Sequence, residues 1–286
     1  FAFSGISFAQ KNNTYLTEDQ KLLIDATFFD ANKSKIVGDL QDAVNKYNYI
    51  LTIDRNNSAA MYEIAYIFNR LGKSREALPY IEKAADIDKT NVWYSMLLAD
   101  CYREVKQIKK ATKVLESLVK KNPDRIDFYL ELSSCYINSG KYVKAINTLD
   151  RVEKKIGVTE NVSIQKEKLY TEIKKVDAAI KEVQKLIAYN PKEARYYGRL
   201  ANLYKIKGWD DKAFEMFKEL LKVDPENPYI HLSLADYYRD KNQRDKAFDE
   251  IKKAFRNYSL DIDAKVRILL PYLEVTKSRP EMKPES

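Results

Sequence analysis

Three side chains in this sequence could support thiol, imidazole or metal chemistry: Cys101, Cys135 and His231. One histidine and two cysteines cannot by themselves complete a four-ligand zinc site or a disulfide framework. A metal site would have to consist of carboxylates alone, and no pattern of Asp and Glu supports one. The chain also lacks a nucleophile motif or a glycine-rich phosphate loop in a strand-turn-helix context. We therefore expect no enzyme activity, no metal and no cofactor.

The composition of the 286-residue chain favours a helical protein. Hydrophobic residues make up 45% of the chain, which is too many for a disordered protein. Only 7 Gly and 8 Pro leave little material for the tight turns of a β-sandwich. The net charge is +8 and the pI is near 9.1. Because acidic residues alternate with basic ones along most of the chain, this charge does not favour a nucleic-acid-binding surface.

A strict period of 34 residues organises the positions of alanine and the aromatic residues. Alanine recurs in one column at Ala43, Ala77, Ala111, Ala145, Ala179, Ala213 and Ala247. An aromatic column recurs at Phe68, Tyr102, Tyr136, Tyr170, Tyr204 and Tyr238. Such a period is the signature of a repeat architecture, in which length counts repeats instead of globular domains.

Glycine and proline divide each repeat into two helices. A glycine column near the middle contains Gly38, Gly72, Gly140 and Gly208, and proline closes repeats at Pro123, Pro191 and Pro225. Glycine supplies the positive φ needed just after a helix, and proline cannot continue one. Each repeat is therefore predicted to be a helix, a turn and a second helix.

The same columns explain the cysteines and the histidine. Cys101 and Cys135 lie one repeat apart, so their Cα atoms would be separated by about the 8 to 10 Å between packed helices, beyond the limit of about 7 Å for a disulfide. His231 occupies a column that holds methionine or tyrosine in other repeats. We interpret all three as packed side chains, with thiol reactivity and catalysis as the less favoured alternatives.

Residues 24–261, taken as seven consecutive repeats, resemble the tetratricopeptide repeat family. Within one repeat the resemblance rests on Leu200, Ala201, Tyr204, Gly208, Ala213, Phe217 and Pro225. It implies an all-α, right-handed superhelical solenoid of seven tandem 34-residue helix-turn-helix repeats, with a terminal helix. The first helices would line a concave groove that binds extended or helical peptide segments. No catalytic residues come with the family, and its fold does not define one function.

The fifth repeat, residues 160–193, departs from the pattern. It has Lys166 and Glu167 where other repeats have leucine and alanine. Because burying unpaired charges is costly, we expect its first helix to rotate or to pack loosely. A bend at 153–168 is one interpretation, and a degenerate but rigidly packed repeat is the other.

The expected organisation follows from these observations. Its parts are a signal-peptide remnant at 1–9, an N-terminal segment at 10–23, repeats one to four at 24–159, repeats five to seven at 160–261, an additional or capping helix at 262–273 and a polar linker or tail at 274–286. We expect the natural chain to continue beyond Ser286. An apolar start followed by Ser7, Phe8 and Ala9 is typical of the end of a secretory signal, with cleavage after Ala9. This predicts a periplasmic or envelope-associated protein; if the stretch is an arbitrary start, the protein is cytoplasmic.

The groove face is predicted by geometry. If the Leu, Ala and Tyr columns point into the core, the opposite face of each first helix lines the groove. In the first three repeats its candidates are apolar and mostly aromatic: Phe28, Tyr62, Tyr66, Trp93 and Met96. In repeats five to seven they are polar and basic: Lys168, Arg195, Arg199, Asn202, Lys205 and Arg239. This surface suits a partner segment with apolar anchors and acidic or C-terminal carboxylate groups. Alternatively, residues 10–23 cover the aromatic side chains near Phe28, and the basic stretch is a solvated face.

Arg195 and Arg199 match the positions of a Lys/Arg pair with which chaperone adaptors of this family grip a C-terminal carboxylate. Those adaptors also need an asparagine one repeat earlier and a lysine and an asparagine two repeats earlier. Here the corresponding residues are Gln165, Leu130 and Ser134. The leading hypothesis is therefore a non-catalytic protein-protein interaction scaffold of cell-envelope assembly or secretion. The alternatives are a cytosolic chaperone-adaptor-like protein and the scaffold part of a longer chain with an enzymatic or envelope-anchoring domain.

Overall fold

The computed structural model of the protein describes residues 16–263, 265–266 and 268–270, and the regular secondary structure in this part is entirely α-helical. The described helices are α1 (Glu18–Val37), α2 (Leu40–Ile53), α3 (Ser58–Arg70), α4 (Ser74–Ile87), α5 (Val92–Glu104), α6 (Ile108–Lys121), α7 (Ile126–Asn138), α8 (Tyr142–Ile156), α9 (Glu160–Glu172), α10 (Val176–Tyr189), α11 (Ala194–Ile206), α12 (Asp210–Val223), α13 (Pro228–Asp240) and α14 (Arg244–Arg256). They form successive helix-turn-helix pairs, which confirms the predicted all-α repeat fold. None of them combines the length and the apolar character needed to cross a membrane.

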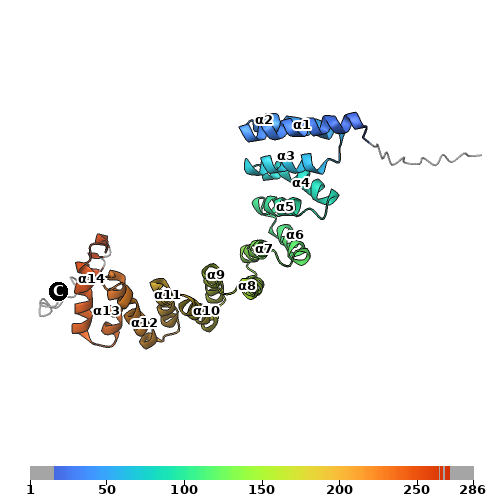
Figure 1. Ribbon diagram of the computed structural model, residues 1–286. Helices are drawn as coiled ribbons and strands as arrows, with labels where there is room; N and C mark the ends of the chain where they lie inside the picture. Colours follow the sequence, from blue (N-terminus) through green and yellow to red (C-terminus); the bar gives the residue numbers. More distant parts are fainter. Residues whose placement is uncertain (1–15, 264, 267, 271–286) are drawn as a thin grey trace, which may run out of the picture. The chain divides into compact units, whose positions relative to one another are not determined.

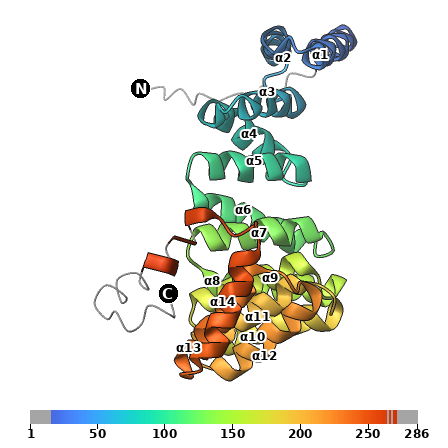
Figure 2. The ribbon, with the colours of Figure 1, turned by 90° about the vertical axis from the view of Figure 1, so that its left-hand side faces the viewer.

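The helices belong to two compact units, which divide between Thr148 and Leu149 within α8. The N-terminal unit holds α1 to α7 and the start of α8, and the C-terminal unit holds the rest of α8 and α9 to α14. Each of α1 to α6 contacts the helix that follows it, as does each of α9 to α13 (Figure 1). Figure 2 shows the succession of α1 to α7 in the N-terminal unit from another side. Within each of these two series, a helix therefore packs against its neighbours in sequence.

A left-handed residue makes the turn between the two helices of a repeat. The predicted glycine column supplies it in most repeats, with φ from 67° at Gly140 to 90° at Gly38. Where glycine is absent, Lys106, Lys174 and Asn242 adopt φ of 63°, 60° and 56°. The turn geometry is therefore imposed by the helix pair even where a Cβ atom opposes it.

The alanine column lies in the core. All seven of its alanines are buried, so paired helices can approach each other closely. In the aromatic column, the Tyr102 and Tyr136 hydroxyls each donate a hydrogen bond of 2.6 Å to a carboxylate of the preceding helix, on Glu82 and Glu116. The column therefore joins one repeat to the one before it.

The ends of the described chain extend the predicted boundaries. Thr17 forms a capping box with Gln20, so α1 begins at Glu18 and residues 18–23 are part of its helix. Within the predicted terminal helix 262–273, the described residues 262–263, 265–266 and 268–270 are helical. The expected signal remnant at 1–9 and the tail at 274–286 lie outside the described residues.

Candidate functional site

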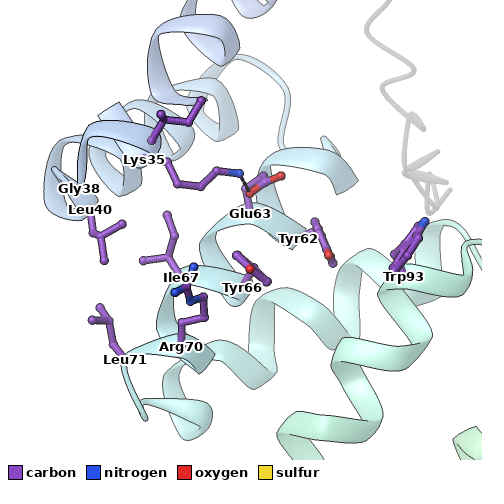
Figure 3. A pocket seen from close by; sticks show the side chains of 11 residues that line it. Lys35, Gly38, Leu40, Tyr62, Glu63, Tyr66, Ile67, Arg70, Leu71 and Trp93 are labelled. Atoms are coloured by element: carbon purple, nitrogen blue, oxygen red, sulfur yellow. Dashed lines mark hydrogen bonds and ion pairs between the residues drawn. The ribbon is translucent and has the colours of Figure 1, made fainter. Parts of the chain in front are cut away.

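An open cleft of about 880 Å³ lies in the N-terminal unit, between the end of α1, the length of α3 and the start of α5. We call it the aromatic cleft, and the lining side chains that carry its chemistry are Lys35, Tyr62, Glu63, Tyr66, Arg70 and Trp93. Figure 3 shows Trp93 at one end of the cleft and Leu40 and Leu71 at the other. The cleft therefore places an aromatic end and an aliphatic end on either side of the α3 residues.

Aromatic side chains make up the walls on α3 and α5. The Tyr62 ring stacks on Tyr66 with centroids 6.2 Å apart and approaches Tyr94 at 5.1 Å. Trp93 is 66% exposed, although it is among the largest apolar side chains of the unit. Burial, and secondarily the Glu63 carboxylate, raise the pKa of Tyr62, so its hydroxyl stays protonated and can donate a hydrogen bond. These rings offer apolar area with a polar edge, which suits peptide side chains.

Two cations lie near the Tyr66 ring. The Lys35 ammonium lies 5.9 Å from the ring centroid, and the Arg70 guanidinium lies 5.8 Å from it. Lys35 also forms an ion pair of 2.5 Å with Glu63. Arg70 is exposed and, among the described residues, has no carboxylate within ion-pair distance. Arg70 is therefore the cation of the cleft that is available to an incoming carboxylate.

The structure separates the five aromatic and apolar candidates of the N-terminal repeats. Tyr62, Tyr66 and Trp93 line the aromatic cleft together. Phe28 is half-buried and meets the buried Tyr47 edge-on at 5.3 Å, so it belongs to the core between α1 and α2. Met96 is half-buried and does not line the cleft.

Sequence reasoning missed Lys35 and Arg70. Both lie near the C-terminal end of the first helix of a repeat. The candidates that we named in these repeats were apolar or aromatic, so the two cations were not among them. The signal that could have found Arg70 is its spacing of four residues from Tyr66, which places the two on one helix face.

The basic candidates of the C-terminal unit fall into two groups. Lys168, Asn202 and Lys205 are exposed. Arg195 and Arg199 are held by carboxylates of the chain itself. Arg195 pairs with Glu193 at 2.9 Å and with Glu160 at 3.2 Å, and Arg199 pairs with the buried Glu167 at 2.9 Å. An incoming carboxylate would have to displace these partners.

Arg239 resembles the paired arginines, because its guanidinium lies 2.6 Å from Asp236 one helical turn earlier. It remains largely exposed on α13. The exposed lysines and Asn202 thus form the part of the predicted basic surface that is open to a ligand.

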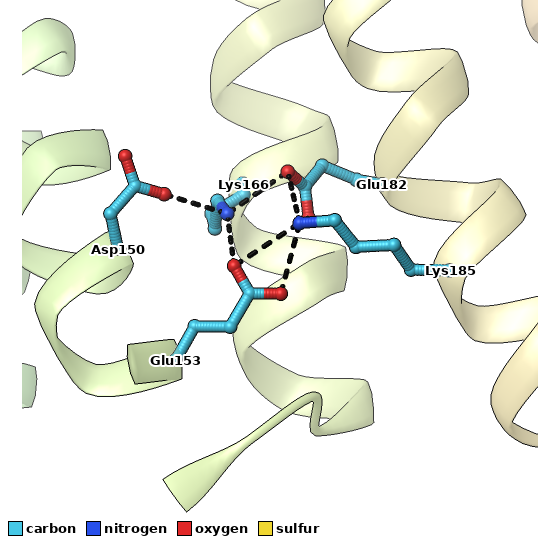
Figure 4. A network of polar contacts seen from close by, with 5 residues as sticks. All are labelled: Asp150, Glu153, Lys166, Glu182 and Lys185. Carbon is cyan, nitrogen blue, oxygen red and sulfur yellow. Dashed lines mark hydrogen bonds and ion pairs between the residues drawn. The ribbon is translucent and has the colours of Figure 1, made fainter. Parts of the chain in front are cut away.

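The fifth repeat overturns the expectation of a rotated or loosely packed first helix. Lys166 on α9 is only 2% exposed, and its ammonium contacts Asp150 at 2.7 Å, Glu153 at 2.6 Å and Glu182 at 2.9 Å (Figure 4). Lys185 joins the same carboxylates, at 3.0 Å from Glu153 and 3.1 Å from Glu182. The charge of Lys166 can be buried because α8 and α10, the helices on either side of α9, supply carboxylate partners for it.

The protonation states of this network follow from its contacts. Burial alone would lower the pKa of Lys166, but its hydrogen bonds to Asp150, Glu153 and Glu182 outweigh burial and raise it. Burial would likewise raise the pKa of Glu153, but hydrogen bonds from Lys166 and Lys185 lower it. Lys166 and Glu153 are therefore both charged at neutral pH, and the network joins α8, α9 and α10.

The other reactive side chains are enclosed, as their columns predict. His231 is buried, with Nδ1 2.5 Å from a Glu250 oxygen and Nε2 2.8 Å from the Pro225 carbonyl. Cys101 and Cys135 are buried free thiols. Burial raises the pKa of Cys101 to about 12, which keeps the thiol protonated and unreactive.

Comparisons with known proteins agree with this fold. The family model of the Psidin N-terminal tetratricopeptide repeat region matches residues 37–149, and a tetratricopeptide repeat model matches residues 194–227. Neither match is to a catalytic domain. No curated protein matches the sequence.

Two of the similar solved structures match over more than four fifths of the chain. The C-terminal part of a repeat-containing protein from Cytophaga hutchinsonii matches with a TM-score of 0.62 and 19% identity, over 84% of this chain and 96% of that one. A repeat protein from Parabacteroides merdae matches with a TM-score of 0.54 and 18% identity, over 85% and 96%. At these identities the likeness concerns the fold alone.

Proposed function

The chain is a tetratricopeptide repeat protein, and we propose that it is a non-catalytic scaffold that binds a peptide segment of a partner protein in the aromatic cleft. The observation that carries this proposal is the grouping of Tyr62, Tyr66 and the largely exposed Trp93 around one cleft. Aromatic side chains in such a setting provide most of the binding energy at protein interfaces. Exposed apolar side chains that group around one cleft, unlike ones scattered singly, are typical of a binding surface.

The lining predicts the chemistry of the segment. Apolar side chains of the ligand would contact Trp93 at one end and the aliphatic end at Leu71. A carboxylate of the ligand would pair with Arg70, because Lys35 is already engaged by Glu63. The ligand is therefore an extended peptide with two apolar anchors and an acidic or C-terminal carboxylate group.

We further propose that Lys168, Asn202 and Lys205 provide a second contact for acidic stretches of the same or another partner. Their exposure supports this role. The carboxylates around Arg195 and Arg199 make these two residues poorer ligands for a peptide than the lysines. A complete carboxylate clamp of the chaperone-adaptor kind is thus a weaker alternative.

The two tryptophans allow a direct test, because Trp93 lies in the cleft and Trp209 lies in the C-terminal unit. In a Trp209→Phe chain, Trp93 is the single fluorescent reporter. Peptides selected against the whole chain from a random library should carry apolar anchors and a carboxylate, and should shift the Trp93 emission. Trp93→Ala or Tyr66→Ala should weaken their binding at least about 10-fold, as for a hot spot.

Tyr229→Ala is the matched control, because Tyr229 is an exposed aromatic residue on α13, outside the cleft. Arg70→Ala should weaken only peptides that carry the carboxylate and leave their amidated versions unchanged. If selected peptides bind Trp93→Ala and Tyr229→Ala equally well, the cleft is not the binding site.

For the location of the protein we propose the periplasm or the cell envelope, with a role in envelope assembly or secretion. The support is the apolar stretch that ends in Ser7, Phe8 and Ala9. Expression of the natural chain and cell fractionation should recover a form that begins at Gln10 in the periplasmic or envelope fraction. An unprocessed cytoplasmic form would favour the cytosolic adaptor instead.

A further inference from the structure

A second cleft, of about 510 Å³, lies in the N-terminal unit away from the aromatic cleft. It is formed by the turn between α5 and α6 and the turn between α7 and α8. The side chains of Lys106, Lys109, Lys110 and Lys141 line it, together with Gln107 and Ser139. We call this feature the basic cleft. Four lysine side chains converge on one concave surface, although the residue pattern of the repeats does not require lysine at these positions.

The charges of the basic cleft are largely uncompensated. No acidic residue occurs in the sequence from 105 to 115 or from 132 to 149, the two segments that contain its lysines. Lys110 has only a distant partner in Glu82, at 3.9 Å. Lys106, Lys109 and Lys141 have no ion-pair partner among the described residues. A cleft of this kind attracts anions.

The first turn of α6 adds to this potential. α6 has no acidic residue there, and its N-cap Gln107 makes no capping hydrogen bond through its side chain. The amides at this end carry the positive end of the helix dipole toward a surface already rich in lysine. This contribution supports the lysines but would not define a site without them.

Aliphatic side chains protrude from the same edge of the N-terminal unit. Because first helices run in one direction through the stack, the turns that follow them lie at one edge, which we call the turn edge. Ile36 and Val37 at the end of α1 are 82% and 72% exposed. Leu71 and Val143, at the next turn and at the α7–α8 turn, are also exposed. The turn edge thus combines free lysines with protruding aliphatic groups.

The opposite edge of the unit has a different character. There the turns between repeats mix both signs of charge, for example Asp54 beside Arg55 and Asp88 beside Lys89. The opposite edge therefore carries both positive and negative charges, as an ordinary solvated surface does, whereas the turn edge is mainly positive at the basic cleft.

We propose that the turn edge of the N-terminal unit binds the surface of an anionic membrane. The lysines of the basic cleft contact lipid phosphates, and Val37 and Val143 insert between headgroups. Free lysines near an anionic leaflet strengthen binding by about 5-fold each, and apolar side chains add to it. A nucleic acid or a soluble acidic peptide would use the lysines but would leave the aliphatic groups exposed to water, which is why we favour a lipid surface. Ile36 and Leu71 of the turn edge also line the aromatic cleft, but the basic cleft, Val37 and Val143 share no residue with its lining, so variants at these positions test the second site independently.

The test uses the whole chain and vesicle flotation. The probes are vesicles of phosphatidylcholine alone, and vesicles in which a third of the lipid is phosphatidylglycerol. The first variant is Lys106→Glu/Lys109→Glu/Lys141→Glu. Its matched control, Arg55→Glu/Lys89→Glu/Lys120→Glu, makes the same change of charge at the opposite edge. A third variant, Val37→Ser/Val143→Ser, leaves the charge unchanged. Circular dichroism melts check that each variant folds.

We expect the natural chain to float with the anionic vesicles and not with phosphatidylcholine alone, with binding that weakens as salt is raised. The lysine variant should lose binding by about 100-fold or more, from about 5-fold per lysine. The control should keep most of its binding. The valine variant should bind measurably less at equal charge.

Three results would overturn the proposal. The chain fails to float with anionic vesicles, or the lysine variant and its control lose binding equally. Alternatively, the valine variant binds as well as the natural chain while free polyglutamate or glycerol phosphate abolishes flotation, which would make the cleft a site for a soluble anion. Loss of peptide binding in the aromatic cleft would affect none of these readouts.

Discussion

At the scale of single residues, some residues adopt an unfavourable backbone conformation because the repeat geometry requires it. Lys174 adopts φ of 60° in the turn between α9 and α10, a conformation that costs a residue with a Cβ atom about 1 to 2 kcal/mol. Lys174→Gly should therefore raise the free energy of unfolding by about 1 kcal/mol. Urea unfolding measures it. The same replacement at the exposed Lys181, inside α10, should lower stability by about 1 kcal/mol, and a loss at both positions would refute the turn argument.

Lys166 shows how a buried charge depends on its partners. Lys166→Met leaves Asp150, Glu153 and Glu182 close together with only Lys185 between them, and should cost about 3 kcal/mol of stability. Lys168→Met is the control, because Lys168 is exposed on the same helix. It should change stability by less than about 0.5 kcal/mol. Equal effects of the two variants would mean that the network contributes nothing beyond its side-chain packing.

The same network predicts a pH dependence. The folded-state pKa of Glu153 lies below its ordinary value of 4.5, so its contribution to stability is present above about pH 4.5 and is lost as pH falls through the folded pKa. In Lys166→Met the carboxylates lose their cation and protonate more readily. The difference in unfolding free energy between the natural chain and the variant should therefore shrink from about pH 6 to about pH 3. A difference that stays constant over this range would contradict the ionic origin of the effect.

These residues also mark a limit of the sequence analysis. When equivalent positions of the repeats are compared, Lys166 stands out only as a charged residue at a position that is apolar in other repeats. Its partners come from α8 and α10, thirteen to sixteen residues away in the sequence, and only the packing of three helices brings them together. The cost of an unpaired charge was the right principle, but the pairing could not be read from one column.

At the scale of helices, the 34-residue period predicted most of the architecture. The alanine column is buried, the left-handed turns occur at the glycine column, and α6, α10 and α12 end two residues before Pro123, Pro191 and Pro225. These features depend on local backbone geometry and on side-chain size, which a sequence column records directly. Of the predicted aromatic candidates, Tyr62, Tyr66 and Trp93 line the aromatic cleft, whereas Phe28 packs edge-on against Tyr47 of the neighbouring helix, a contact that a column comparison does not record.

The alanine column makes a helix-packing prediction. Ala213 is buried in the interior of the C-terminal unit, so Ala213→Leu should overpack its contacts and cost about 1 to 3 kcal/mol. Glu215→Leu, two residues along on the exposed side of α12, should change stability by less than about 0.5 kcal/mol. Thermal melts of both variants make the comparison. Unchanged melting of Ala213→Leu would show that the column does not set the helix spacing.

At the scale of the whole molecule, the net charge is +8. The structure indicates a different location for the basic residues that can attract a ligand than the sequence did. In the C-terminal unit the prominent arginines already hold carboxylates. In the N-terminal unit, Lys106, Lys109 and Lys141, which have no ion-pair partner among the described residues, converge on the basic cleft. The predicted bend at 153–168 stays a prediction. The buried network joins α9 to α8 and α10, so looseness inside the fifth repeat is no longer a reason to expect one.

The division into two compact units leads to a prediction about cooperativity. In repeat proteins, stability is a sum of repeat terms and nearest-neighbour terms, so a local change acts most strongly on its own surroundings. Trp93 reports on the N-terminal unit and Trp209 on the C-terminal unit. We therefore expect Lys166→Met to lower the urea midpoint measured in a Trp93→Phe chain, where Trp209 is the reporter, more than the midpoint measured in a Trp209→Phe chain. If the urea midpoints of both reporters shift by the same amount, α8 couples the two units and they unfold as one cooperative body. The two units would then differ in their internal contacts but not in their unfolding.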